Sequence, residues 1–493
     1  IAEWISTAAN TVRCVNYTKA DGTAVASAVA ANRRDCVASG SLVSGNVVAL
    51  NTDGTVSAVA EDPAAIGTEV VANTAYDNMC RNTVLSSTKG VIVYYGAGAF
   101  YCKVATVTGS SISFGAATSW ASGISNPEIE ALTSTQFVIA FTDDSNANKG
   151  KAIVGTISGT TVSFGTIVQY EAGQSRDPSL CKLTDTKVVI AYCDMSNSSY
   201  GTAIVGTISG SSISFGSSVV FSSSNSSHHE AVSRLSDTKV LIAFNDTPAT
   251  DGTAVVGTIS GTSISYGTKV VYSSGRAFYN VITSISETQA LICYRAMVSP
   301  SSSSDPGVSV IATIDGTTIT YGSDVTFIAA TSGTVIDSMV LVSPDHVLVG
   351  FRDNADNYGK TVIGTISGTT VSYASPVTFN SASTVTTSVS LLATGKIFIT
   401  FGDGGNSGYP TGVIYTLASS NADEWIGITE STVSDAATAT IAFLAAIVSN
   451  QTSLTINSTY YVDEDGSLTV STTSGRKLGR ALSTTELLIE GNA

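Results

Sequence analysis

Gly201-Thr-Ala-Ile-Val-Gly-Thr-Ile-Ser-Gly-Ser-Ser-Ile-Ser-Phe-Gly216 decides the fold, because versions of this stretch recur from Val104 to Leu417. The glycine of its central turn returns every 50 to 55 residues, at Gly109, Gly159, Gly210, Gly261, Gly316 and Gly368. A threonine three positions earlier extends the series to a seventh copy at Thr416. Such a period indicates a repeat architecture in which each copy is one supersecondary unit.

Each copy predicts four short strands, which in the third copy are residues 179–184, 187–192, 202–208 and 212–221. The second strand is a nearly continuous apolar run, as expected for a strand buried on both faces. The last strand alternates polar and apolar residues, so one of its faces is expected to be wet. A Ser-Gly-Ser hairpin signal separates the third and fourth strands. Four antiparallel strands at this period are typical of β-propeller blades.

The seventh repeat, residues 391–417, has three strands but lacks the fourth. The missing strand stands ahead of the first repeat, as Ile66-Gly-Thr-Glu-Val-Val-Ala72. We therefore expect an all-β protein whose main part is a seven-bladed β-propeller. Its ring would be closed by this N-terminal strand, which removes the open sheet edges.

Composition restricts the partners. Only 12% of residues are charged and the net charge is −15, so no basic stripe is available for nucleic acid. The longest apolar run outside the repeats, Ile441–Val448, is far shorter than the ~20 residues that span a bilayer. We expect an extracellular protein that neither binds nucleic acid nor inserts into a membrane, and that needs no cofactor.

Seven cysteines show no metal-type spacing. Cys14 and Cys36 could bridge in the N-terminal segment, as could Cys80 and Cys102 in the first repeat. The odd count leaves at least one thiol unpaired, so the redox compartment stays open.

The two ends of the chain read as parts of one β-domain. Residues 41–59 predict a hairpin that turns at Asp53-Gly54, and residues 460–470 predict one that turns at Asp465-Gly466. We expect a split β-domain of residues 1–62 and 419–493 with the propeller, residues 63–418, inserted between its parts. Two unrelated terminal extensions are the alternative.

The motif order NxDGTVxxV, YYVxxDGxL and GRxLGxALSxTxLLI resembles small β-modules of bacteriophage virion and tail-fibre proteins. The repeats of the GTISGTxISFG type likewise resemble propellers of phage fibres. The resemblance covers most of residues 39–489, and its motifs are structural rather than catalytic. It implies a place on a virion appendage. Because the parts of such modules are normally contiguous, it also implies that the propeller is an insertion.

An aromatic-x-Asp motif follows the second strand of five repeats, ending at Asp143, Asp194, Asp246, Asp353 and Asp403. The Asp- and Asn-rich loops that follow could hold a hard cation such as Ca²⁺. No complete calcium loop occurs, and Ala97 and Ala296 replace the aspartate in two repeats. Turns in which the carboxylate satisfies backbone groups explain the pattern better, so no metal site is predicted.

A candidate ligand site comes from the residues that enter the innermost strands, which converge at the mouth of a propeller's channel. Four neighbouring repeats place polar or aromatic groups there, and this combination suits carbohydrate. An ordinary surface loop is the alternative, and so is a catalytic pair of Asp177 and Glu230. A metal site at the two histidines would need a third ligand. The candidate residues are Asn126, Arg176, Asp177, His228, His229, Glu230, Tyr279 and Asn280.

Six N-x-Ser/Thr sequons matter only if the producing cell glycosylates secreted proteins. They lie at Asn16, Asn197, Asn225, Asn245, Asn450 and Asn457. The aromatic residue that recurs once per repeat in the fourth strand is expected to pack between neighbouring repeats.

These features predict a non-enzymatic extracellular structural or adhesive protein, a phage fibre or virion-appendage subunit that displays a propeller to a host-surface glycan or protein. The first alternative is a self-assembling subunit of an extracellular filament or surface layer. There, the segment Ile1–Arg34 would pair with a neighbouring subunit's sheet edge. The second alternative is a glycan-degrading propeller enzyme. A homo-oligomer or filament is expected in either structural role.

Overall fold

A computed structural model describes residues 33–51, 53–76, 79–225, 227–246, 251–297, 305–329, 334–420, 425–430, 432–443, 446–472 and 476–490. Residues 61, 62, 224, 225, 227–229, 419 and 420 are described by their backbone alone. Within these ranges nearly all regular structure is β-strand, with two short 3-10 helices, η1 (Asp144–Asn146) and η2 (Gly404–Asn406). No helix in the described part of the chain is long and apolar enough to cross a membrane.

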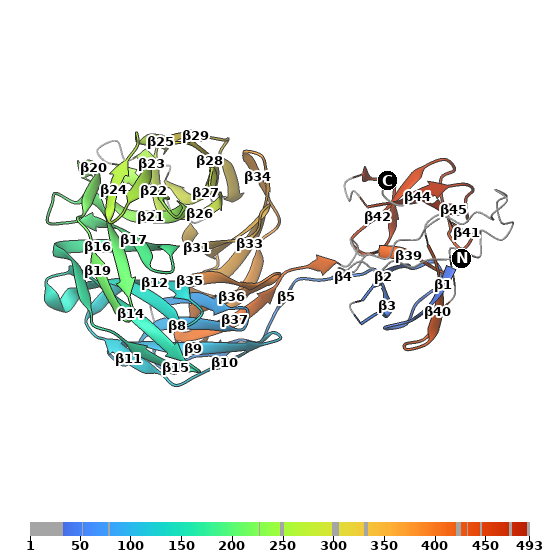
Figure 1. Cartoon of the computed structure of the whole chain (residues 1–493), viewed down its shortest axis with the longest axis horizontal. Coiled ribbons are helices and arrows are strands. Elements are labelled where there is room, and N and C mark those ends of the chain that lie inside the picture. Colours follow the sequence, from blue (N-terminus) through green and yellow to red (C-terminus); the bar gives the residue numbers. More distant parts are fainter. Residues whose placement is uncertain are drawn as a thin grey trace. The chain divides into compact units, whose positions relative to one another are not determined.

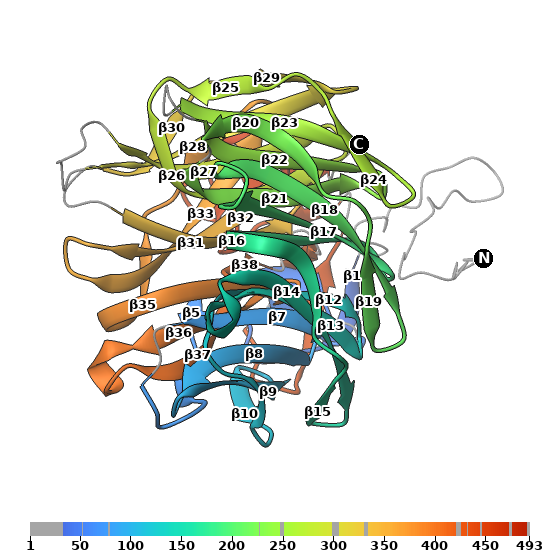
Figure 2. The ribbon, with the colours of Figure 1, turned by 90° about the vertical axis from the view of Figure 1, so that its left-hand side faces the viewer.

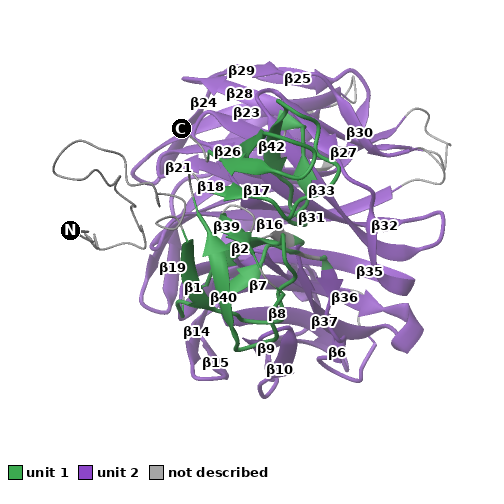
Figure 3. Cartoon of the chain, turned by 90° about the vertical axis from the view of Figure 1, so that its right-hand side faces the viewer, with its two compact units in different colours: residues 1–64, 418–493 green, residues 65–417 purple. Residues whose placement is uncertain are grey.

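The chain divides into two compact units (Figures 1 and 3). Unit 2 comprises residues 65–417, and unit 1 comprises residues 1–64 with 418–493. These bounds lie within two residues of those expected from the sequence.

Each repeat of unit 2 supplies an innermost, a second, a third and an outer strand. The innermost strands are β7 (Cys80–Ser86), β12 (Ile124–Thr133), β16 (Val168–Thr184), β21 (Ser227–Ser236), β26 (Arg276–Ser286), β31 (Thr334–Ser343) and β35 (Val377–Ala393). The second strands are β8 (Lys89–Gly96), β13 (Gln136–Asp143), β17 (Lys187–Asp194), β22 (Lys239–Asp246), β27 (Gln289–Met297), β32 (His346–Asp353) and β36 (Lys396–Asp403).

The third strands are β9 (Ala99–Thr108), β14 (Lys149–Ser158), β18 (Tyr200–Ser209), β23 (Asp251–Ser260), β28 (Gly307–Asp315), β33 (Tyr358–Ser367) and β37 (Tyr409–Thr416). The outer strands, mostly in two pieces, are β10 (Ser111–Phe114), β11 (Thr118–Ala121), β15 (Thr161–Phe164), β19 (Ser212–Phe215), β20 (Val219–Asn225), β24 (Ser263–Tyr266), β25 (Val270–Ser273), β29 (Thr318–Tyr321), β30 (Val325–Ile328) and β34 (Thr370–Tyr373). The start of β16 and of β35 completes the outer strand of the preceding repeat.

Consecutive strands of a repeat pair antiparallel, so the described repeats build a propeller-like all-β fold around a central channel (Figure 2). The last third strand, β37, has no hairpin partner after it. Instead β5 (Ala65–Ile66) and β6 (Val70–Val71) pair with it, with Ile66 opposite Tyr415 and Val71 opposite Thr411. The first residues of unit 2 therefore lie beside its last strand.

A hydrogen bond from the start of each second strand joins neighbouring repeats. A lysine or glutamine side chain donates to the backbone oxygen of the turn glycine in the next repeat. Lys396 of the last repeat donates in the same way to Gly109 of the first, at 3.1 Å. The exception is His346, whose Nδ1 lies 2.9 Å from the carboxylate of Asp345. The repeat after it has no such hairpin to offer a turn glycine.

In all repeats but one, a glycine directly after the first piece of the outer strand lies against the next repeat. An ideal Cβ on Gly165 would lie 1.9 Å from the backbone oxygen of Ser211, and the other repeats have similar approaches. Only Ala374 departs from glycine at this position, in the repeat that precedes the missing hairpin. His346 and Ala374 both lie in the repeat that precedes the missing hairpin, and both differ from their equivalents in the other repeats.

The core of unit 2 consists of apolar clusters between adjacent sheets. In five repeats the outer-strand aromatic packs on an aromatic of the preceding repeat, as in Phe215 on Tyr170, whose ring centroids are 5.8 Å apart. The pairs Phe221–Tyr266, Tyr272–Tyr321 and Phe327–Tyr373 repeat this contact. The expected packing between repeats is confirmed at these positions.

The bridge between Cys80 and Cys102 that the sequence left open does not form. Neither thiol forms a disulfide, and both are fully buried. Cys80 lies on β7 and Cys102 on β9, with β8 between them. Two strand spacings are about 9.6 Å, beyond the ~7 Å between Cα atoms that a disulfide allows. Cys36 is free as well, and Cys14 lies outside the described residues.

Unit 1 contains two five-stranded sheets with the same strand order. One runs β1 (Arg33–Val37), β40 (Thr438–Ala442), β39 (Trp425–Thr429), β2 (Val47–Leu50) and β3 (Val56–Ala58). The other runs β41 (Ile447–Val448), β45 (Leu487–Ile489), β44 (Lys477–Ala481), β42 (Thr459–Val462) and β43 (Leu468–Thr469). A separate pair joins β4 (Glu61–Asp62) to β38 (Ser419–Ser420).

Candidate functional site

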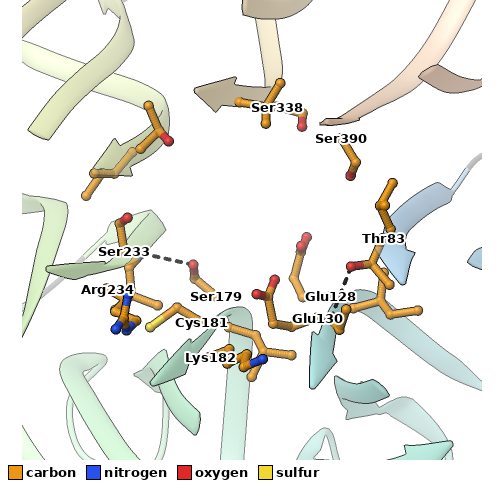
Figure 4. A pocket seen from close by; sticks show the side chains of 18 of the residues that line it. Thr83, Glu128, Glu130, Ser179, Cys181, Lys182, Ser233, Arg234, Ser338 and Ser390 are labelled. Carbon is orange, nitrogen blue, oxygen red and sulfur yellow. Dashed lines mark hydrogen bonds between the residues drawn. The ribbon is translucent and has the colours of Figure 1, made fainter. Parts of the chain in front are cut away.

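A cavity of about 1610 Å³ follows the channel of unit 2 and is lined by all of its innermost strands (Figure 4). Side chains alternate along a strand, so every second residue of each innermost strand reaches the channel. These positions lie four and two residues before an apolar residue that closes the strand, Leu132 in the second repeat. They hold Glu128 and Glu130 there.

Side-chain oxygens of these strands bind backbone N–H groups of the next repeat. Thr83 accepts from Ala131, Ser179 from Val232 and Ser338 from Val389, at 3.0 to 3.1 Å. The innermost strands of neighbouring repeats do not pair with one another; each pairs with the second strand of its own repeat. The N–H groups on the unpaired side therefore need other acceptors. The hydroxyls that line the cavity supply them.

Two carboxylates point side by side into the cavity, those of Glu128 and Glu130 (Figure 4). Glu128 accepts from Arg81 Nε at 3.0 Å. Burial raises the pKa of Glu130 to about 7, and the Glu128 charge adds to this while Lys182 opposes it. Glu130 is therefore about half protonated at neutral pH.

A third carboxyl group, Asp337, lines the cavity from β31. Burial raises its pKa to about 6 against the opposing charge of Arg81, and the backbone N–H of Thr387 donates to it at 3.0 Å. Arg81 therefore interacts electrostatically with carboxyl groups on two sides, Glu128 and Asp337.

Two of the cations beside the cavity are held by other groups. Lys182 donates to the backbone oxygen of Leu132 and forms an ion pair with Asp185 at 2.8 Å. Arg234 donates to the backbone oxygen of Leu183 and pairs with Asp237 at 2.6 Å. The charged ends of both side chains turn away from the centre of the cavity in Figure 4. Hydroxyl and carboxyl groups thus border the central space, together with Arg81, Cys181 and apolar side chains such as Val281.

The sequence-predicted residues Asn126, Asp177 and Tyr279 occupy bulges. Each has a positive φ, between +49° and +54°, at a register shift of its innermost strand. The side chain of Asn126 donates to Asp177 at 2.7 Å, and Arg176 lies 3.5 Å from the same carboxylate. The structure therefore brings Asn126, Arg176 and Asp177 together.

Asn280 lines the cavity of the channel, and Tyr279 is half-buried. Tyr279 packs against an apolar cluster, and Asn280 is 6% exposed. The Asn280 side chain accepts from Tyr272 Oη at 2.7 Å and donates to the backbone of Ala277 at 3.2 Å. These contacts hold the strand bulge.

Glu230 is buried and lies, with Arg176 and Asp177, near the thiol of Cys193. Burial raises the pKa of this thiol to about 12, so it stays protonated. His228 and His229 have side chains outside those described.

The aspartates after the second strands act in turns, as the sequence indicated. Asp403 accepts from the backbone N–H of Gly405 at 2.9 Å. Asp353 accepts from the N–H of Ala355 at 2.9 Å and from the Lys360 ammonium at 2.7 Å. In the described ranges, no group of three or more His, Cys, Asp or Glu side chains could hold a metal ion.

Two of the sequons are unsuited to glycosylation in the folded chain. Asn245 is 1% exposed within β22. The amide nitrogen of Asn450 already donates to Ser44 and to the backbone of Thr429, both at 2.9 Å. Asn197 and Asn457 are exposed. Asn16 and the side chain of Asn225 lie outside the described part.

Sequence reasoning missed Glu128, Glu130, Asp337 and Arg81. A signal was present in Asn126-Pro-Glu-Ile-Glu-Ala-Leu132, where two glutamates alternate within an apolar strand. The position six residues before Leu132 falls on a bulge, and the bulge shifts the alternation of faces, so the predicted set missed the residues two and four before Leu132.

Comparisons with known proteins give distant structural likeness alone. No family model matches the chain, and no curated protein matches it. A solved protein from Lactobacillus plantarum is 12% identical, with 74% of this chain and 100% of that chain covered and a TM-score of 0.44.

A putative 6-phosphogluconolactonase from Bacteroides fragilis is 10% identical, with coverage of 67% and 96% and a TM-score of 0.46. The N-terminal domain of Nup159 is 9% identical, with coverage of 77% and 97% and a TM-score of 0.39. Similarity at this level transfers no activity to this chain.

Proposed function

We propose that the protein is a non-enzymatic extracellular binding protein, a phage-fibre or virion-appendage subunit whose unit 2 binds a host-surface glycan in its channel. Unit 2 is then a closed seven-bladed propeller inserted into unit 1. Seven second strands, β5 and β6 on β37, and the bond from Lys396 to Gly109 support this form. The virion setting rests on the resemblance of the motifs to phage modules.

The observation that carries the binding proposal is the composition of the cavity. Hydroxyl groups and the carboxyl groups of Glu128, Glu130 and Asp337 face a common space. Carboxylates accept from paired sugar hydroxyls, and serine and threonine both donate and accept. The volume exceeds the range of about 300–1,000 Å³ that is usual for small-molecule sites, so a ligand of several sugar units fits.

A glycan screen followed by calorimetric titration tests the proposal. Glu128→Gln and Ser233→Ala are expected to weaken binding about tenfold or more, since each loses a hydrogen bond to the ligand. Glu287→Gln, an exposed acid between β26 and β27, is the matched control and should bind like the wild type. Equal affinities in all of these variants would exclude the channel as the site. A host-surface protein bound elsewhere would then be the remaining candidate.

One observation favours an enzyme as second candidate. Glu130 has a pKa of about 7 beside a second carboxyl group, Glu128, and glycosidases need one protonated and one ionised carboxyl. Turnover of the bound glycan that disappears in Glu130→Gln while binding persists would establish the enzyme. Binding without turnover would support the adhesive role. Electron microscopy of the native particle separates fibres on virions from open-ended filaments, the self-assembly alternative.

A further inference from the structure

Unit 1 is built from two equivalent modules. The first module comprises β1, β2, β3, β39 and β40, and the second comprises β41 to β45. Both sheets place their strands in the order first, fifth, fourth, second, third. Backbone bonds recur at matching positions, Gly54–Asn51 with Gly466–Asp463 and Gly45–Thr429 with Asn457–Ala481. The fourth strands share a bulge and a tightly packed glycine, Gly427 and Gly479.

The two modules pack face to back. One apolar cluster joins the inner face of the second module, with Val462, Leu478 and Leu487, to the outer face of the first. The outer face supplies Val47 and Ala49, with Trp425 packed at the edge of the cluster. The outer face of the first module therefore covers the inner face of the second. In such a stack, the inner face of a module packs against the module before it and the outer face against the module after it.

In the described part of the chain, no side chain from outside the first module joins the cluster on its inner face. Val48, Val56 and Ile441 in that cluster are 0% exposed, but part of the face is not fully covered. Leu50, Ile426 and Phe443 are half-buried. Their equivalents in the second module, Val462, Leu478 and Ile489, are all 0% exposed. A covering layer is expected at these three positions.

The N-terminal segment carries the sequence of such a layer. Residues 2–12, Ala-Glu-Trp-Ile-Ser-Thr-Ala-Ala-Asn-Thr-Val, match residues 423–433, Asp-Glu-Trp-Ile-Gly-Ile-Thr-Glu-Ser-Thr-Val, at five of eleven positions. Two of the three tryptophans of the chain, Trp4 and Trp425, stand at the same place in this motif. Trp425 is the residue that lies against the inner face of the second module.

The outer face of the second module is unsuited as a cover. Lys477 and Arg480 stand where the first module has Trp425 and Ile428, and both form ion pairs with Glu490, at 3.0 and 3.1 Å. A charged face cannot replace an apolar one without a desolvation cost, and a polar outer layer is typical of the end of a stack. A second module from another chain is therefore a poor occupant of the open face.

We propose that residues 1–32 of the same chain cover the inner face of the first module, with Trp4 on Leu50 and Ile426 as Trp425 lies on the second module. The segment ends at Arg33, the first residue of β1, an edge strand of the same sheet. Its connection thus starts at the sheet that it covers. The proposal is independent of any ligand in unit 2.

Cysteine alkylation in the full chain tests this contact, because Cys36 is a half-buried member of the face. Trp4→Ala is expected to speed the alkylation of Cys36 several-fold, as followed by peptide mass spectrometry. Asn10→Ala, in the same segment but not at a matched position, should leave the rate unchanged. Cys80 and Cys102, buried in unit 2, are internal controls. An equal Cys36 rate in Trp4→Ala and wild type would overturn the proposal.

Hydrogen exchange separates local uncovering from loss of the fold. Faster exchange in residues 47–58 and 425–430 of Trp4→Ala, with residues 459–469 unchanged, supports the proposed contact. Faster exchange throughout unit 1 contradicts a local role of Trp4. Protection of Cys36 that falls on dilution of the wild-type protein would show a segment from another copy, and would overturn the intrachain form.

Discussion

The inner and the outer positions of the unit 2 repeats differ in how uniform they are. At the outer hairpins, the turn glycine, the lysine or glutamine that binds it, and the packed aromatic recur with little change. Along the channel, equivalent positions hold Arg81, Glu128, Ser179, Ala231 and Val281. The outer residues must fit the neighbouring repeat, whereas the channel residues only border a space. The side chains of the repeats therefore differ from one another mainly along the channel.

The largest expected effect is at the packed glycines of the outer strands. Gly165→Ala should lower the free energy of unfolding by about 3 kcal/mol or more, because its Cβ would meet backbone rather than a movable side chain. Ala374→Gly is the matched control and should cost only about 0.5–1 kcal/mol, through chain entropy. Denaturant unfolding measures both. Equal losses of stability in Gly165→Ala and Ala374→Gly would show that packing against the next repeat does not distinguish these two positions.

Asn82 tests the contact between the first and last repeats. Its side-chain nitrogen donates to the backbone of Ser388 at 2.7 Å and to Thr400 at 2.9 Å, and the residue is 5% exposed. Asn82→Ala should cost about 2 kcal/mol, since buried acceptors lose their donor. The exposed Asn197→Ala should change stability by less than about 0.5 kcal/mol. A small effect of Asn82→Ala in thermal unfolding would mean that the two repeats separate without cost.

Glu130 links the channel to pH. Its pKa is raised from 4.5 to about 7 in the folded chain, so the native state binds a proton more tightly than the unfolded state. Stability should therefore fall as pH rises from about 4.5 to 7, and the loss should be complete above that range. Glu130→Gln should remove this slope and be more stable at pH 8 by about 1–2 kcal/mol.

Unfolding midpoints across pH measure this effect, with Glu287→Gln as the control. Asp337 leaves a smaller slope of the same sign between 3.8 and about 6 in both variants. A Glu130→Gln profile parallel to that of the wild type would show that Glu130 does not titrate in this range.

The smallest expected effect is at the start of the second strands. Lys396→Met should cost about 0.5–1 kcal/mol by removing the exposed bond to Gly109. His346→Lys should bring no gain, because no turn glycine faces it. A clear stabilisation by His346→Lys would reveal a hydrogen-bond acceptor where the seventh repeat lacks its hairpin. Position 346 would then behave like the other starts of the second strands.

The strands that carry the outer positions could be predicted from the sequence because their residues repeat. The period of the turn glycine placed the strands, and the position of Ile66–Ala72 indicated the strand that pairs with β37. The channel was harder to predict for the same reason, since its residues do not repeat. The bulges at Asn126 and Asp177 shift the alternation of side chains by one. Asn and Asp tolerate a positive φ, but Tyr279 and Thr386 adopt it at the equivalent bulges, so residue type alone does not mark these positions.

The ends of the chain show another limit. Both hairpins of unit 1 were identified from their Asp-Gly turns, but the equivalence of the two modules was not recognised. The matching hairpins lie more than four hundred residues apart, as Asp53 and Asp465 do, and strand order is a property of pairing rather than of sequence. Alignment of Gly427 with Gly479 becomes evident only when the bulges are superposed.

The pairing of β5 and β6 with β37 has a mechanical consequence. Unit 2 is entered and left through antiparallel strands that lie side by side, and β4 and β38 continue this pairing on the other side of the boundary. A tensile load between the units would be shared by two covalent chains that run in parallel through the connection. Such a load does not pull residues 65 and 417 apart, so it would not separate β5 and β6 from β37.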